Sequence, residues 1–327
     1  MEAAAAPASK NVLRRTRHLA DRIGDDALKI VTGAAAVIAL VVIAAIIWKV
    51  IEGSWPAIRH FGLPFLWHGT WNPVFGHEAY GARNFIIGTL VTSFGAMLLA
   101  GPLAVAIGLF LTELAPASLR PPVASLVEML AAVPSVVVGL WGILVLGPFM
   151  RSDIEPFLHR YFGWIPFFSG SPSQSGVLVA IVVLTMMALP IISSVCRELF
   201  QSVPRDLKEA AVGLGATRWE MVRDVVLYNV RGGVVAAVIL GLGRALGEAI
   251  AVTQVIGNSL GPFHLSLFGS GNTLASQIAA NYQGAGTNLQ VASLVYLALI
   301  LLVITFIANV IAQLIVRRFE FQRTGGS

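Results

Sequence analysis

Long apolar stretches separated by shorter polar ones set the pattern of this chain. Six stretches have the length and apolarity of membrane-spanning helices, which need about 20 residues to cross a hydrocarbon core roughly 30 Å thick. They lie at residues 30–48, 85–111, 126–146, 177–196, 234–256 and 291–316. None of them alternates between apolar and polar positions as the strand of a membrane β-barrel does. The pattern therefore predicts an all-α integral membrane protein with six transmembrane helices.

The distribution of basic residues predicts how these helices are oriented, because Lys and Arg are retained on the cytoplasmic side of a membrane. Of the 22 Lys and Arg residues, 16 fall in residues 1–29 and 317–327 and in the connections at 114–122 and 197–231. Both termini are therefore expected to be cytoplasmic. We expect four regions: a cytoplasmic tail at 1–26, a first transmembrane helix with an external loop at 27–84, a membrane domain at 85–316 and a cytoplasmic tail at 317–327.

Composition narrows the classes of function. Hydrophobic residues make up 56% of the chain and charged residues only 12%, as in integral membrane proteins. The net charge of +5 reflects topology, and the basic residues form no stripe with aromatic residues, which argues against nucleic-acid binding. The one cysteine, Cys196, and six scattered His residues predict no disulfide, metal or other cofactor. Without a G-x4-G-K-[ST] phosphate loop, the chain is expected to be neither an ATPase nor another enzyme.

The connection at 202–231 is a substantial polar surface between predicted spans, and it carries its own helix signals. Ser202 is expected to cap a first helix, and Gly215 to end it in the left-handed conformation. Thr217 and Glu220 match the S/T-x-x-E capping box that begins a second helix. Apolar residues at helical spacing on the first helix are Leu207, Ala210, Ala211 and Leu214. This stripe predicts a docking surface for another protein; the alternative is an amphipathic helix lying on the bilayer.

Arg244 and Glu248 are charged residues inside an apolar stretch. A charge at the membrane centre costs roughly 2.5 to 3.5 kcal/mol on insertion scales, so Arg244 needs a partner or an aqueous cavity. Glu248, four residues on, is expected on the same helical face. Two interpretations stay open: the pair fixes helix packing, or it lines a path for an oxyanion, which a planar guanidinium binds well. Pro102, Pro134 and Pro190 also fall in apolar stretches and are expected to kink or break their helices.

The first polar helix carries a specific resemblance to a known family. Glu209, Ala210, Ala211 and Gly215 stand at the spacing of the E-A-A-x-x-x-G loop of bacterial ABC-importer permeases. In that family the short helix of this loop docks into a cleft of a cytoplasmic ATPase. The resemblance therefore implies that these four residues belong to an ATPase coupling loop.

Four further strings resemble the permease subunits of phosphate-specific ABC importers. They are VEMLAAVPSVVVGLWG at 127–142, PFFSG at 166–170, LGRALGE at 242–248 and TLASQIA at 273–279. The resemblance runs from about residue 85 to the C-terminus and, more loosely, through the first span. It implies a type I ABC importer permease fold, with a five-helix core and one N-terminal helix, in the bacterial cytoplasmic membrane.

The same resemblance implies partners and a cargo. The chain is expected to pair with a second permease subunit as a heterodimer, with two copies of a cytoplasmic ATPase and with an external phosphate-binding protein, surrounded by membrane lipid. Phosphate would pass along a path that includes Arg244 and Glu248, and the separate ATPase would hydrolyse ATP. The alternatives are an ABC permease for another oxyanion such as sulfate or molybdate, and an ion-coupled secondary transporter, whose internal repeats this sequence lacks.

Overall fold

The structure is a computed structural model that describes residues 19–324, with side chains described from 26 to 317. Within these residues the chain is almost entirely helical, which confirms the predicted all-α class. Six helices in this part are long and apolar enough to span a membrane: Asp26–Phe61, Arg83–Leu114, Ser135–Phe162, Val177–Ser202, Arg218–Gly247 and Asn288–Arg317. Of the predicted tails at 1–26 and 317–327, only 19–26 and 317–324 are described, and both are helical.

The helices follow one another with few long connections. In chain order they are α1 (Leu19–Phe61), α2 (Arg83–Leu109), α3 (Arg120–Ala132), α4 (Ser135–Trp141), α5 (Gly147–Phe149), α6 (Glu155–Phe162), α7 (Val177–Ser202), α8 (Arg205–Gly213), α9 (Arg218–Glu220), α10 (Tyr228–Gly247), α11 (Ile250–Val255), α12 (Leu274–Asn281) and α13 (Asn288–Thr324). Short 3-10 turns lie at Leu63–Leu66 and Pro166–Phe168, and π-helical turns at Phe110–Leu114, Gly142–Leu146, Met150–Ile154 and Met221–Leu227. Because the π turns continue their neighbours, α4 to α6 form one helix and α9 to α10 another.

The chain divides into two compact units, Met1–Lys49 and Val50–Ser327. The described part of the first unit is the beginning of α1, whose side chains from 26 to 49 are all exposed. This stretch holds the most apolar window of the chain, with a mean hydropathy of 2.9. A helix that is apolar all round suits a lipid environment or a membrane-embedded partner. The predicted span at 30–48 lies within α1, which continues beyond the apolar run to Phe61.

The second unit is a bundle in which α7 lies at the centre. Of the most apolar window of α7, 72% is buried, against 39% or less for the other five long helices. Glycines let its neighbours approach closely: Gly108 of α2 lies against Cys196 and Phe200, and Gly241 of α10 lies against Ile192. Cys196 is fully buried in this contact, as a small apolar residue. The packing of α2, α7 and α10 fixes the frame on which the charged residues are placed.

An aromatic cluster holds the connection between α1 and α2. Phe65 stacks on Tyr296 of α13 with ring centroids 4.5 Å apart, and Trp71 packs on Tyr80 at 4.7 Å. Trp71 also contacts Phe85, at the beginning of α2. Burial raises the pKa of the Tyr80 phenol, so this side chain stays neutral. The loop is therefore packed against the ends of two long helices.

The third predicted span, at 126–146, is wrong as a single helix, because the chain breaks between α3 and α4. Val133 is extended, with ψ of 126°, and Pro134 follows it. Proline has no N–H to continue the helix and disfavours helical geometry in the residue before it. At 13 residues α3 is about 20 Å long, too short to cross the hydrocarbon core alone. Pro102 and Pro190, in contrast, lie inside the continuous helices α2 and α7.

The fifth predicted span, at 234–256, is broken as well. The helix α10 ends at Gly247, and Glu248 is extended, with ψ of 112°, before α11 begins at Ile250. The spans predicted at 85–111, 177–196 and 291–316 each lie within one long helix, because their apolar runs contain no such break.

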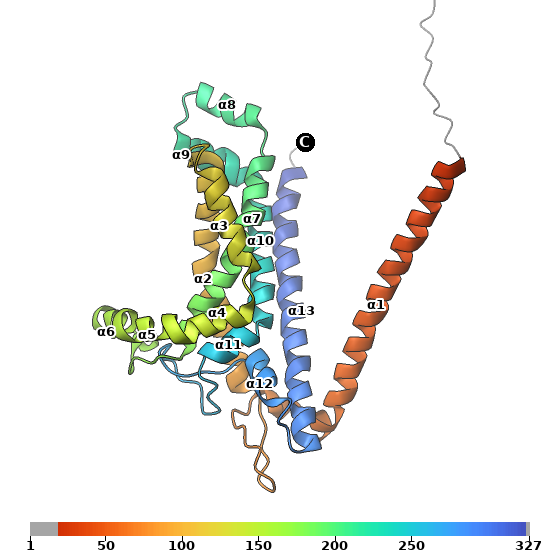
Figure 1. Ribbon diagram of the computed structural model, residues 1–327, viewed down its shortest axis with the longest axis vertical. Coiled ribbons are helices and arrows are strands. Elements are labelled where there is room, and N and C mark those ends of the chain that lie inside the picture. Colours follow the sequence, from red (N-terminus) through yellow and green to blue (C-terminus); the bar gives the residue numbers. More distant parts are fainter. Residues whose placement is uncertain (1–18, 325–327) are drawn as a thin grey trace, which may run out of the picture. The chain divides into compact units, whose positions relative to one another are not determined.

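Figure 1 shows how the second unit is arranged. The helices α2, α3, α7, α10 and α13 run along the bundle, whereas α4 to α6 run across it. The short helix α8 lies at one end of the bundle, and α11 and α12 lie towards the other. The first break thus separates α3, which runs along the bundle, from α4, which runs across it. The second separates α10 from the short helix α11 towards the end of the bundle.

Candidate functional site

Arg244 lies near the end of α10, at the level of the break between α3 and α4. Its side chain is exposed and helps to line a cavity of about 40 Å³, room for about one water. The other lining residues are Leu130, Ala131 and Val133 of α3, Val138 of α4, and Met186, Met187 and Ile191 of α7. A guanidinium therefore stands among apolar side chains at the point where a membrane helix is interrupted.

Glu248 is the residue directly after α10, four residues beyond Arg244, and the chain leaves the helical path at its extended ψ of 112°. Glu248 Oε1 accepts a hydrogen bond from the backbone N–H of Ala251 at 3.3 Å, at the beginning of α11. Within the described residues Arg244 and Glu248 form no ion pair. The charge of Arg244 is thus not balanced by a carboxylate of this part of the chain.

Close backbone packing holds the two helix breaks together. A Cβ at Gly139 of α4 would stand 2.8 Å from Ala251 Cα, and one at Gly142 would stand 2.8 Å from a methyl of Val255. Only glycine permits α4 and α11 to approach so closely. Interrupted helices inside a membrane protein occur where they are buried in protein or line a water-filled cavity. The two interruptions meet beside an arginine, which makes this region the candidate path for an anion.

The coupling segment begins differently from its prediction. Ser202 is the last residue of α7, and its hydroxyl donates to Leu199 O at 2.7 Å, so it does not cap α8. Pro204 precedes α8 instead and makes no side-chain cap. Proline suits this place because its fixed φ and missing N–H cost little at a helix start.

The corner after α8 matches its prediction. Gly215 has φ of +91°, in the left-handed region. Its N–H donates to Val212 O at 3.0 Å, and the N–H of Ala216 donates to Ala211 O at 3.1 Å, which is the Schellman pattern. The capping box is confirmed next: Glu220 Oε2 accepts from the N–H of Thr217 at 2.8 Å, and Thr217 Oγ1 accepts from the N–H of Glu220 at 3.3 Å. A well-defined corner therefore joins α8 to the long helix that carries Arg244.

The outer face of α8 is available to a partner. Glu209 and Ala210 are exposed, and Leu214 is 90% exposed, whereas Ala211 is half-buried against the bundle core. Small side chains next to an exposed leucine leave a shallow apolar surface with a carboxylate beside it. The sequence-predicted residues Glu209, Ala210, Ala211 and Gly215 thus all lie on one short helix and its corner.

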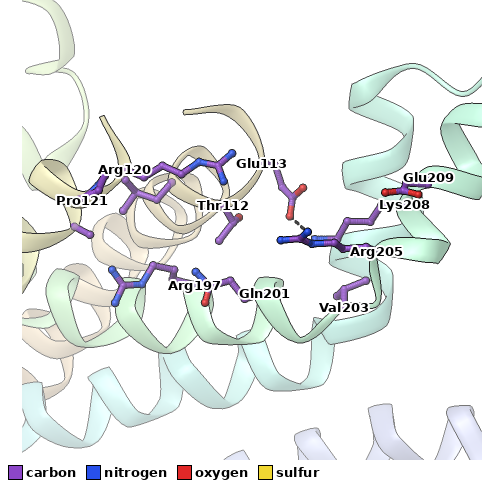
Figure 2. A pocket seen from close by; sticks show the side chains of 12 residues that line it. Thr112, Glu113, Arg120, Pro121, Arg197, Gln201, Val203, Arg205, Lys208 and Glu209 are labelled. Atoms are coloured by element: carbon purple, nitrogen blue, oxygen red, sulfur yellow. Dashed lines mark hydrogen bonds and ion pairs between the residues drawn. The ribbon is translucent and has the colours of Figure 1, made fainter. Parts of the chain in front are cut away.

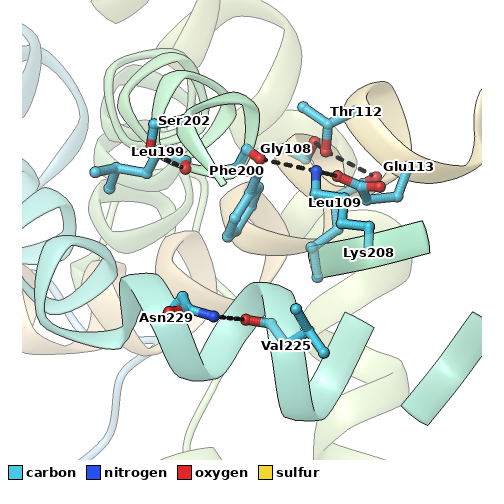
Figure 3. A network of polar contacts seen from close by, with 10 residues as sticks. All are labelled: Gly108, Leu109, Thr112, Glu113, Leu199, Phe200, Ser202, Lys208, Val225 and Asn229. Atoms are coloured by element: carbon cyan, nitrogen blue, oxygen red, sulfur yellow. Dashed lines mark hydrogen bonds and ion pairs between the residues drawn. The ribbon is translucent and has the colours of Figure 1, made fainter. Parts of the chain in front are cut away.

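Lys208 connects α8 to two membrane helices. Its Nζ donates to Glu113 Oε1 at 2.6 Å, at the end of α2, and to Phe200 O at 3.1 Å, near the end of α7 (Figure 3). The Lys208 and Glu113 side chains are only 17% and 10% exposed. Sequence reasoning did not identify this contact, because its two residues are 95 positions apart. Lys208 therefore ties α8 directly to the end of α7 and to the turn that follows α2.

The residues that the structure describes hold no group of three or more His, Cys, Asp or Glu side chains that could bind a metal ion. The chemistry of the described sites thus consists of a membrane arginine, a pair of helix breaks and a surface helix.

Comparison with known families and proteins agrees with this geometry. The family described as "Binding-protein-dependent transport system inner membrane component" matches residues 104–321. The phosphate transport system permease protein PstC of Pasteurella multocida is 45% identical over 291 residues, which cover 87% of this chain and 89% of that protein. The protein of the same name from Mesorhizobium japonicum is 43% identical, covering 90% of both chains.

Solved structures share the fold at low sequence identity. A bacterial alginate ABC transporter, in complex with an alginate-bound periplasmic protein, has a TM-score of 0.57 at 19% identity. The match covers 90% of this chain and 97% of the transporter chain. The inward-facing MetNI methionine ABC transporter has a TM-score of 0.50 at 22% identity and covers 73% of this chain and 94% of its own. These similarities are of fold alone, and they confirm the predicted type I ABC importer permease fold.

Proposed function

Since this chain belongs to the family of binding-protein-dependent transport system inner membrane components, we propose that it is the permease subunit of an ATP-driven importer and forms the path for inorganic phosphate. It is a multi-pass membrane protein and not an enzyme. The phosphate cargo is supported by relatives that are phosphate transport system permease proteins and match most of this chain. Family membership sets aside the ion-coupled secondary transporter.

The observation that carries the proposal is the exposed Arg244 between two broken helices. An arginine at membrane depth must face an aqueous cavity or a partner rather than lipid. Its guanidinium offers two parallel donors to an oxyanion and keeps its charge at any physiological pH. Glu248, held at the beginning of α11, places a negative charge along the same route and keeps an anion from binding too tightly. Arg244 and Glu248 thus line the translocation path in this proposal.

The partners follow from the family and from the uncovered surfaces. An importer of this family works with an ATPase and a binding protein. In finer detail, we propose a heterodimer with a second, PstA-like permease, two copies of a PstB-like ATPase and a PstS-like external phosphate-binding protein. The ATPase docks on Glu209, Ala210, Ala211 and the corner at Gly215. Lys208 then passes the movement of α8 to the membrane helices.

The proposed topology places α8 and both termini in the cytoplasm of a bacterium, and α11 and α12 towards the outer side. The regions are a cytoplasmic tail at 1–26, the first helix and external loop at 27–84, the permease domain at 85–316 with its coupling loop at 202–231, and a second tail at 317–327. The excess of Lys and Arg on the side of α8 supports this orientation.

Uptake of radiolabelled phosphate tests the proposal. Cells lacking this gene and other phosphate uptake systems would receive the wild-type chain, Arg244→Gln or Arg244→Lys. We expect the wild type to restore uptake of phosphate but not of sulfate. Arg244→Gln should reduce uptake about 10- to 100-fold, because a hydrogen bond to a charged group is lost, and Arg244→Lys should reduce it less.

One control and two contrary outcomes decide how the result is interpreted. Each variant must still purify with the ATPase, since a subunit that fails to assemble says nothing about the path. Normal phosphate uptake by assembled Arg244→Gln protein would exclude an obligatory role for this residue. Restored sulfate or molybdate uptake without phosphate uptake would assign the permease to another oxyanion.

A further inference from the structure

A second and much larger cavity lies beside α8. It has a volume of about 720 Å³, room for roughly two dozen waters, so a hydrated oxyanion fits. Its walls come from the end of α2, the beginning of α3, the end of α7 and the first turns of α8 (Figure 2). None of the residues discussed for the Arg244 region lines it. It is therefore a separate site at the α8 end of the bundle.

The charged groups around this cavity are mostly basic. Arg120, Arg197, Arg205 and Lys208 face the two carboxylates of Glu113 and Glu209. Lys208 is paired with Glu113, and Arg197 is paired at 2.6 Å with Glu128 of α3.

Two arginines of the cavity keep donors to spare. Arg120 uses only its Nε, which donates to Ala115 O at 2.8 Å, and its side chain extends towards Glu113 in Figure 2. Arg205 is exposed and forms no side-chain hydrogen bond or ion pair to the part of the chain that the structure describes. The cavity thus offers guanidinium groups that an oxyanion can occupy.

Residues of α3 line both this cavity and the one beside Arg244. Pro121 and Ala124 line the large cavity, and Ala131 lines the small one. Glu128 falls between them at helical spacing, about 4.5 Å of helix rise from Ala131. Its ion pair with Arg197 of α7 therefore stands between the two cavities.

We propose that the large cavity is the exit site for the transported oxyanion, with Arg120 and Arg205 as its binding groups. Glu128 holds Arg197 away from the anion, so that the site binds weakly enough to release it. The inference rests on the proposed function for the direction of transport and the cargo. The same chemistry would bind a phosphate of a lipid headgroup, which the test below distinguishes from free phosphate.

The test uses the whole importer in proteoliposomes, with the binding protein outside and a constant ATP concentration in the lumen. The initial rate of labelled phosphate uptake is measured as unlabelled phosphate in the lumen is raised. We expect luminal phosphate to occupy the exit site and inhibit uptake. Arg120→Gln and Arg205→Gln should each raise the half-inhibiting concentration about tenfold, whereas Glu128→Gln, which frees Arg197, should lower it.

Arg151→Gln is the control, because Arg151 is an exposed arginine that lies outside the cavity and outside the coupling loop at 202–231. Its half-inhibiting phosphate concentration should equal that of the wild type. Loss of packing alone would not move Glu128→Gln and the arginine variants in opposite directions.

The outcomes separate the two proposals. Normal uptake with the same half-inhibiting concentration in Arg120→Gln, Arg205→Gln and wild-type protein would overturn the exit site and leave the proposed function intact. An inhibition that appears with phosphatidylglycerol in the vesicles, and not with luminal phosphate in pure phosphatidylcholine, would assign the cavity to lipid and also overturn it. No ATP-dependent phosphate uptake by the wild type would overturn the proposed function itself, and the exit site with it.

Discussion

The turn after α8 depends on a single backbone angle, φ of +91° at Gly215. An added Cβ would meet no atom within 4 Å there, or at Gly213, which has no positive φ. Gly215→Ala therefore introduces backbone strain of roughly 1–2 kcal/mol without a clash. We expect a smaller fraction of the protein to adopt the left-handed turn after α8, so that the apparent affinity for the ATPase falls by up to about 5- to 30-fold. Titration of the purified ATPase measures this, with Gly213→Ala as the matched control; equal affinities would remove the corner from the docking surface.

Single residues could be predicted from sequence where their partners are close along the chain. Thr217 and Glu220 are three residues apart, so the pattern that predicts their capping box contains both partners. Arg244 and Glu248 form no ion pair although they are only four residues apart. Glu248 instead accepts from the backbone N–H of Ala251, and the break that brings Ala251 there is accompanied by packing between α4 and α11, which no local pattern contains.

Among the helices, the contact of α8 with the end of α2 gives a sharp prediction. Lys208→Met leaves the little-exposed Glu113 carboxylate without its cation, and Glu113→Gln leaves the ammonium without its anion. Removing one partner of a fully buried ion pair costs about 3–5 kcal/mol, and the cost is smaller for this part-buried pair. We expect each variant to hydrolyse ATP while phosphate uptake falls at least tenfold, because the movement of α8 no longer reaches α2.

Exchanging the two charges provides the control for this contact. The double variant Lys208→Glu with Glu113→Lys restores an ion pair in the opposite sense, so uptake per ATP hydrolysed should recover in part. Recovery is measured as the ratio of phosphate uptake to ATP hydrolysis in the same vesicles. If the single variants transport as efficiently as the wild type, α8 acts through other contacts.

The long helices could be predicted from sequence, and so could a weak point at each of three prolines, but not which of them interrupts its helix. Apolar runs at 85–111, 177–196 and 291–316 predicted α2, α7 and α13, because lipid selects for length and apolarity. Pro134 breaks its helix whereas Pro102 and Pro190 do not, although all three lie in apolar runs. The difference comes from packing, since α4 turns aside to meet α11. Proline alone therefore predicts a weak point and not a break.

At the scale of the whole molecule, the single chain exposes a helix, α3, and a charged residue, Arg244, that a membrane protein usually covers. No residue of α3 is buried, and Leu126 and Met129 of that helix are 66% and 64% exposed. Arg244 is exposed on the same bundle. Lipid suits the apolar side chains but not the guanidinium, so a second subunit or water must cover the face that carries Arg244. The sequence alone could not show this, because burial within one chain is a property of its fold.

The orientation of the whole chain can be tested because its single cysteine, Cys196, is fully buried. The buried thiol of Cys196 is not expected to react, so any label on a variant reports the introduced cysteine. Phe75, in the loop between α1 and α2, is 84% exposed and lies on the proposed outer side, whereas Ser327 ends the proposed cytoplasmic tail. In intact spheroplasts a membrane-impermeant maleimide should label Phe75→Cys and not Ser327→Cys. After permeabilisation both should be labelled, and the parent chain should stay unlabelled throughout. Labelling of Ser327→Cys in intact spheroplasts would reverse the proposed orientation and put α8 on the side opposite to ATP, where no ATPase could drive it.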